Sequence, residues 1–127
     1  MGGRYIIVQD GAEDTRIYLY TQWGGSQIAF VLQTALKRRA RWDDAPYLTR
    51  IIFDALTDGR QGQETGFGIS TKICDNDNPG LLVDVTSEIV AVLPMCGRGF
   101  GDVPVQTATF EEFCKLANPS EWLERAS

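Results

Sequence analysis

A short run of glycine and serine between a predicted strand and a predicted helix is the segment best suited to binding chemistry. Gly24, Gly25 and Ser26 directly follow the strand. Backbone N–H groups at such a turn can face an anion, and the Ser26 hydroxyl adds a further donor. Tyr20 and Trp23 offer aromatic faces on which a base can stack. The segment therefore predicts an anionic nucleotide site, although a tight turn with a serine cap and a core tryptophan explains the same residues.

A basic run at the end of the first predicted helix is the second candidate. Arg39 and Arg41 can grip phosphate oxygens, and Trp42 provides a further stacking face. Arg98, in a glycine-rich loop, adds a third anion-facing position. Two structural interpretations compete for the run: a solvated helix end, or a clasp in 41–44 that sets the angle between two helices. For Arg98 the competing interpretation is an ordinary connecting loop.

Other kinds of site fit the sequence poorly. The chain has no histidine and three widely spaced cysteines, which excludes histidine-dependent nucleophilic catalysis, histidine-based zinc sites and a four-cysteine site within one chain. Segment 75–80 imitates the start of a calcium loop, but Pro79 intrudes and the twelfth position is Thr86, so a turn is expected. Glu64 or Asp84 would be the general base of an enzyme. The expected site has no catalytic residue, metal or cofactor.

The pattern of apolar residues predicts the elements that position these candidates. Strands 4–9 and 15–22, joined by an Asp-Gly turn, predict a β-hairpin with one apolar face. Two helices follow, because apolar residues recur at helical spacing from Ile28 to Leu36 and from Leu48 to Leu56. Further elements are strands at 66–73, 81–86, 89–93 and 105–108, an irregular loop at 94–104, a helix at 110–117 and a last turn capped by Ser120.

The order β-β-α-α-β-β-β-β-α predicts one α+β domain: an antiparallel sheet with the central helical pair on one face. Short connections disfavour a doubly wound parallel sheet. Helix N-caps are expected at Ser26, at Asp43 or Asp44, and at Thr109, which would form a capping box with Glu112. Exposed edge strands favour pairing with another copy, so we expect a homo-oligomer, most simply a dimer.

Composition limits the partners. The net charge is −5 with a pI near 4.6, which argues against general nucleic-acid binding. No apolar run is long enough to cross a membrane, and the N-terminus lacks the pattern of a signal peptide. The odd, scattered cysteines are typical of a reducing compartment, so a cytoplasmic location is expected.

Segments 18–25, 41–56 and 64–70 resemble a family of small uncharacterised proteins found in phages, prophages and other mobile elements. The family shares a Tyr-Thr-X-Trp-Gly-Gly turn, an Arg-Trp-Asp-Asp helix start and a Glu-Thr-Gly-aromatic-Gly-Ile segment. One departure is Gln22, where relatives often have histidine. The resemblance implies a setting, phage accessory genes that counter host immunity, and no particular activity.

Together with that setting, the candidate residues predict an anti-defence protein that acts in the cytoplasm of the bacterial host. It would sequester a nucleotide immune signal without cleaving it, with arginines and backbone N–H groups on the anion and aromatic faces on the bases. The second hypothesis is an acidic inhibitor, similar to anti-CRISPR proteins, that occupies a basic surface of a host defence protein. The third is a nucleotide hydrolase.

Overall fold

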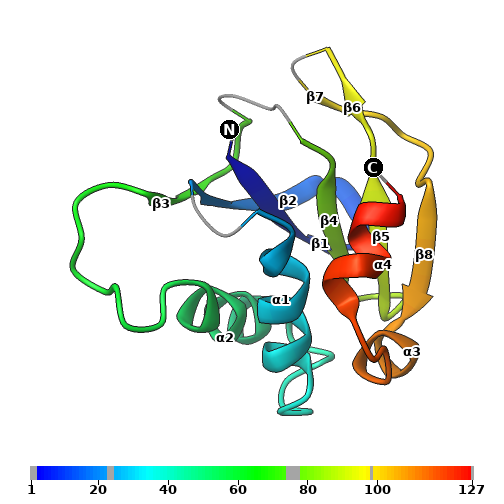
Figure 1. Cartoon of the computed structure of the whole chain (residues 1–127), viewed down its shortest axis with the longest axis horizontal. Coiled ribbons are helices and arrows are strands. Elements are labelled where there is room, and N and C mark those ends of the chain that lie inside the picture. The colour runs from blue at the N-terminus through cyan, green and yellow to red at the C-terminus, as the bar shows by residue number, and fades with distance from the viewer. Residues whose placement is uncertain (1–2, 23–24, 74–77, 98, 127) are drawn as a thin grey trace.

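The fold is a mixed β-sheet with helices packed on one of its faces (Figure 1). The computed structural model describes residues 3–22, 25–73, 78–97 and 99–126. Within them, the main sheet has six strands in the order β3-β2-β1-β4-β5-β8, and β6 and β7 form a separate hairpin. The strands are β1 (Arg4–Asp10), β2 (Ala12–Thr21), β3 (Phe67–Ser70), β4 (Gly80–Asp84), β5 (Ile89–Leu93), β6 (Met95–Cys96), β7 (Gly99–Phe100) and β8 (Gln106–Thr109). The helices are η1 (Gly25–Gln27, a 3-10 turn), α1 (Ile28–Leu36), α2 (Ala45–Leu56), α3 (Phe110–Cys114) and α4 (Pro119–Arg125).

The β1–β2 hairpin confirms the prediction made from the Asp-Gly turn. Gly11 adopts a φ of +85°, a conformation that glycine reaches without strain, so Asp10 and Ala12 face each other across a very tight turn. β2 therefore begins at Ala12, earlier than the alternation alone indicates.

The sheet is mixed, which corrects the predicted antiparallel arrangement. β4 lies beside β1 and runs parallel to it, with Ile6 opposite Leu81 and Val8 opposite Val83. The other neighbouring pairs in the main sheet are antiparallel. Parallel neighbours need a long crossover, and the path from β1 through β2, both helices and β3 supplies it. The short connections were misleading because the parallel strands are not consecutive along the chain.

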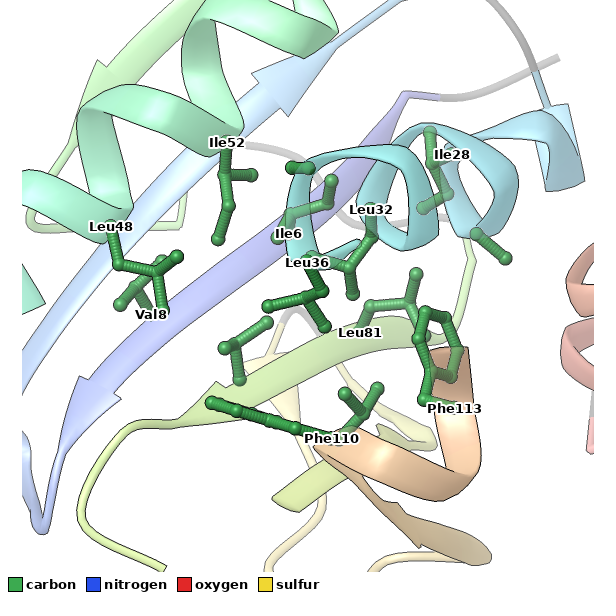
Figure 2. Close-up of a cluster of buried hydrophobic side chains, with 14 of the residues drawn as sticks. Ile6, Val8, Ile28, Leu32, Leu36, Leu48, Ile52, Leu81, Phe110 and Phe113 are labelled. Atoms are coloured by element: carbon green, nitrogen blue, oxygen red, sulfur yellow. The ribbon is translucent and has the colours of Figure 1, made fainter. Parts of the chain in front are cut away.

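The main core lies between the sheet and the helices. Figure 2 shows Leu48 of α2 above Val8 of β1, and Phe110 of α3 near Leu36 of α1. Phe110 and Phe113 are almost fully buried, so the short helix α3 is held by its two aromatic side chains. The apolar residues that recur at helical spacing in the sequence supply the helix side of this core. The expected placement of the helical pair on one side of the sheet is confirmed.

The opposite face of the sheet carries a smaller apolar cluster built from Tyr5, Ile7, Tyr18, Leu82, Ala91 and Leu93. The β6–β7 hairpin, at the top of Figure 1, supplies Phe100 to this cluster. Phe100 packs closely over Gly80, where an added Cβ would lie 2.7 Å from the ring. The segment 94–104 is therefore not wholly irregular, because its hairpin places an aromatic side chain on this face.

The start of α1 differs from the prediction. Residues 25–27 form η1, so the N-cap of α1 is Gln27 and not Ser26. The Gln27 side chain makes no capping hydrogen bond. α2 begins after Asp44, one of the two predicted caps, again without a side-chain capping bond.

The C-terminal helices are capped by side chains. Thr109 forms the predicted capping box: its Oγ1 accepts from the Glu112 backbone N–H at 3.0 Å, and the Glu112 carboxylate accepts from the Thr109 N–H at 2.8 Å. α4 begins before the predicted Ser120, because Asn118 is its N-cap and Oδ1 accepts from the Glu121 N–H at 3.0 Å. Among the described residues, no helix has the length and apolar character needed to cross a membrane.

Candidate functional site

The two halves of the predicted nucleotide site lie at opposite ends of α1. Gly25 and Ser26 precede the helix, whereas Arg39, Arg41 and Trp42 follow it. α1 has nine residues, and a helix rises about 1.5 Å per residue, so about 13 Å separates the two groups along the axis. The structure therefore does not gather these residues around one small ligand.

Arg39 and Trp42 form a structural clasp between the end of α1 and α3. The two terminal guanidinium nitrogens of Arg39 donate to the Glu111 carboxylate, Nη2 at 2.9 Å, and the guanidinium carbon lies 5.1 Å from the centre of the Trp42 ring. The Trp42 Nε1–H donates to the Leu36 carbonyl at 3.0 Å. The indole packs edge-on against the Phe110 ring, and the centres of the two rings lie 5.3 Å apart. These contacts join α1 to α3, whereas the clasp predicted in 41–44 would set the angle between α1 and α2; Trp42 belongs to both.

The charges of the clasp stabilise each other. The hydrogen bond to Glu111 raises the pKa of Arg39, and the same bond lowers the pKa of the Glu111 carboxyl. Arg39 has a φ of +53°, a backbone conformation that side chains rarely adopt. The polar and aromatic groups of Arg39 and Trp42 are therefore engaged within the fold.

Arg41 is held in a similar way on the other side of the loop. Its guanidinium carbon lies 4.6 Å from the centre of the Tyr47 ring, and Nη1 lies 3.8 Å from an Asp44 oxygen. Its side chain remains more than half exposed, at 57%. Arg41 sets the entry into α2 and still reaches solvent.

Tyr20 lies away from both groups. Its ring packs against Tyr5, with centres 5.4 Å apart, on the sheet face opposite the helices. A Cβ added to Gly3 would lie only 2.0 Å from the Tyr20 ring, so this ring also covers the start of the chain. The remaining predicted residues, Trp23, Gly24 and Arg98, lie outside the described residues.

A cavity of about 230 Å³ lies beside the first turn of α1. The end of β2, the start of α1, the end of α2 and the loop into β3 form its wall. One cation, one carboxylate and one aromatic ring contribute to a wall that is otherwise apolar or neutral. The lining residues are Thr21, Gln27, Ile28, Val31, Ala55, Leu56, Asp58, Arg60 and Phe67.

Local backbone contacts bring the cavity wall together. The Gln22 N–H donates to the Gly66 carbonyl at 2.8 Å, and Phe67 pairs with Thr21 in the sheet. After α2, the Arg60 N–H donates to the Thr57 carbonyl at 2.7 Å and turns the chain back toward the cavity. The sequence carried partial signals for this site, a helix stop before Arg60 and a glycine-flanked aromatic at Phe67, but no signal joined them.

Arg4 supplies a second cation on the same side of the sheet. β1 alternates, so Arg4 shares the helix-covered face with Ile6, and in the sheet it is paired with Thr21 of the cavity wall. Its Nη1 atom is buried and has no hydrogen-bond partner among the described residues. Desolvation lowers the pKa of Arg4, and the charge of Glu124 on α4 opposes that effect. A buried guanidinium nitrogen without a partner favours an anion nearby.

A shallow groove of about 430 Å³ runs between α1 and α2 and continues from the cavity. Val31, Ala55 and Asp58 border both hollows. Phe30 lines the groove, and 53% of its surface is exposed. The remaining lining residues are Thr34, Arg38, Ile51 and Asp54.

The carboxylates considered for catalysis are far apart. Glu64 is exposed in the loop before β3, near the Thr21 end of the sheet, whereas Asp84 pairs with Gln9 near the other end. Asp84 oxygens accept from the Thr86 N–H at 3.1 Å and from the Gln9 side chain at 3.5 Å. Within the described ranges, no group of three or more metal-binding side chains occurs. The first half of the calcium-like segment, residues 75–77, lies outside those ranges.

No protein-family model, curated protein or solved structure matches the chain. Functional inference therefore depends on the chemistry of the cavity, the groove and the charged surfaces.

Proposed function

We propose that the protein binds a small anionic nucleotide in the cavity at the start of α1 and holds it without cleaving it. The observation that carries the proposal is that Arg60, Phe67 and Asp58 line one cavity together with Thr21 and Gln27. A cation, an aromatic ring and several hydrogen-bonding groups are what a nucleotide requires, because it combines a phosphate, a flat base and a ribose.

Each lining group suits one part of such a ligand. The Arg60 guanidinium matches the geometry of phosphate oxygens. The half-buried Phe67 ring offers a surface for base stacking, which tolerates any base. The exposed Asp58 carboxylate can accept from ribose hydroxyls or from a base amino group.

Two further features favour negative charge on this side of the molecule. The positive end of the α1 dipole, reached through η1, lies beside the cavity that Gln27 and Ile28 line. Arg4 contributes a buried, unpartnered Nη1 on the same side of the sheet. Gly25 and Ser26, in η1, keep the position that the sequence indicated for an anion-binding turn.

The cavity volume limits the ligand. Pockets for drug-sized molecules have volumes of roughly 300–1,000 Å³. At about 230 Å³, this cavity encloses part of a mononucleotide unit and leaves the remainder at its mouth beside Asp58. Holding without cleavage is supported by the absence of histidine from the chain and by the wide separation of Glu64 and Asp84. The anti-defence setting rests on the resemblance to phage-encoded proteins.

Ligand-induced stabilisation tests the proposal. Purified protein is heated with cyclic dinucleotides, cyclic trinucleotides and NAD-derived nucleotides; a ligand at about 100 times its Kd adds about 2.7 kcal/mol of stability. We expect one nucleotide to raise the Tm of the wild type and of the Arg125→Ala control, but not of Arg60→Ala. Chromatography of the released ligand should recover it intact. Equal binding by folded Arg60→Ala protein, or no shift with any nucleotide, would refute the proposal.

A second candidate function has its own observation. The β1–β2 and β4–β5 turns lie side by side, joined by a hydrogen bond from Thr86 Oγ1 to Asp10 Oδ1 at 3.1 Å. These turns and the strand ends beside them, residues 10–14 and 84–88, carry five carboxylates and no basic residue: Asp10, Glu13, Asp14, Asp84 and Glu88. Such a surface suits an inhibitor that covers a basic site on a host defence protein. Reversal of Glu13 and Asp14 to lysine should then abolish inhibition of a nucleic-acid-binding effector and leave nucleotide binding intact.

A further inference from the structure

The groove between α1 and α2 combines exposed apolar residues with opposite charges at its two ends. Its apolar part includes Phe30, Val31 and Ala55, and Phe30 is a large side chain that is 53% exposed. Isolated exposed apolar residues are common on protein surfaces, but here the phenyl ring adjoins a hollow of about 430 Å³. The groove therefore has the shape to accept an apolar side chain from a partner.

The charges lie at separate ends of this groove. Asp58 borders the cavity as well, so it lies beside the first turns of α1, near Val31. Arg38 follows the end of α1, seven residues after Val31, which corresponds to about 10 Å of helix. Both side chains are exposed, and neither forms an ion pair with another described residue. By contrast, Asp54 is already paired with Arg50.

A surface with a cation at one end and a carboxylate at the other is complementary to itself under a two-fold rotation. The rotation places Arg38 of each copy against Asp58 of the other, and Phe30, which precedes Val31 at the Asp58 end, lies beside each of these two contacts. Isologous contacts of this kind are the commonest interface in homodimers. We propose that two copies of the chain associate through the α1–α2 groove.

This pairing has a consequence for the cavity. Asp58 borders both hollows, so the second copy's Arg38 would lie at the cavity mouth, where the proposed ligand emerges. That step rests on the proposed function and deepens it, because a second cation would then face the phosphate. The dimer itself is independent of any ligand, and its test uses none.

Charge reversal tests the interface through the mass of the protein in solution. Sedimentation velocity of the wild type without nucleotide should show the mass of two 14.1 kDa chains. Arg38→Asp and Asp58→Arg should each show one chain, because like charges then face each other at both ends. An equal mixture of the two variants should return to two chains, since each contact in the mixed dimer joins opposite charges. The Arg125→Asp control, on α4, should stay dimeric.

Other results would overturn the proposal. A single-chain mass for the wild type would do so, as would two-chain masses for both reversed variants. Phe30→Ser provides a second probe, because it removes an exposed side chain and should also give single chains in a folded protein. If the reversed variants stay dimeric and Ile69→Lys does not, the contact lies at the β3 edge, where Ile69 is 59% exposed. Loss of the dimer without loss of nucleotide binding would leave the proposed function standing.

Discussion

Gln33 is a buried polar side chain that links α1 to the end of α3, and its replacement tests the core argument most directly. Only 2% of its surface is exposed. Its Nε2 group donates to the Leu116 carbonyl at 2.8 Å, to the Phe113 carbonyl at 3.0 Å and, at a longer 3.4 Å, to the Cys114 carbonyl. The Phe113 carbonyl also accepts from the Leu116 N–H at 3.3 Å, so the Leu116 carbonyl depends more on Gln33. Gln33→Leu keeps the side-chain size and removes both donors.

The expected loss of stability follows from the two shorter bonds, to Leu116 and Phe113. An acceptor left without a partner costs about 1–3 kcal/mol, and a lost bond to an acceptor that keeps another donor costs about 0.5–1.5 kcal/mol. The sum is about 1.5–4.5 kcal/mol. With an unfolding entropy near 2.1 cal/mol/K per residue, a chain of 127 residues should lose about 6–17 °C in Tm.

The assay is thermal unfolding followed by circular dichroism, with urea unfolding as a second measure. Gln63→Leu is the matched control, because Gln63 is exposed in the loop after α2 and should tolerate the same change. A Tm for Gln33→Leu within about 2 °C of the wild type would refute the reasoning, since a cost of 2 kcal/mol corresponds to several degrees. It would mean that water or another donor satisfies the α3 carbonyls.

Three further perturbations have defined outcomes. Gly80→Ala should cost about 1–3 kcal/mol in urea unfolding because the new methyl meets the Phe100 ring, and Phe100→Leu should recover part of that loss. Glu111→Gln should lower the urea midpoint at neutral pH; because the folded pKa of Glu111 is depressed by Arg39, the difference should shrink as the pH falls through and below the ordinary glutamate range near 4.3. Arg41→Ala should leave nucleotide affinity, measured by calorimetry, within about twofold, which is about 0.4 kcal/mol, since its side chain packs on α2 away from the cavity.

Local signals predicted the elements well. Helical spacing located α1 and α2, and the Thr109–Glu112 pair located the start of α3, because these patterns act within a few residues. The parallel pairing of β1 with β4 had no such signal, since it joins strands separated by two helices. A strand's pattern shows which face is buried but not which strand lies beside it.

The site was predicted only in part for the same reason. The turn that holds Gly25 and Ser26 adjoins a cavity through Gln27, but the cation and the ring on its wall come from elsewhere in the chain: Arg60 lies in the loop after α2, and Phe67 begins β3. The partner of Arg39 is Glu111, which lies far along the chain. Side chains predicted to bind phosphate were thus taken up by contacts that no local pattern indicates.

The central position of β1 has a consequence for synthesis on the ribosome. β1 emerges first, yet in the folded protein it lies between β2 and β4, and β4 begins only at Gly80. Until then one edge of β1 exposes unpaired backbone groups, and the core lacks Leu81 and Val83. Folding of the domain is therefore a late event in translation. A chain interrupted before Gly80 would present an apolar strand edge, the kind of surface that chaperones bind and that otherwise leads to aggregation.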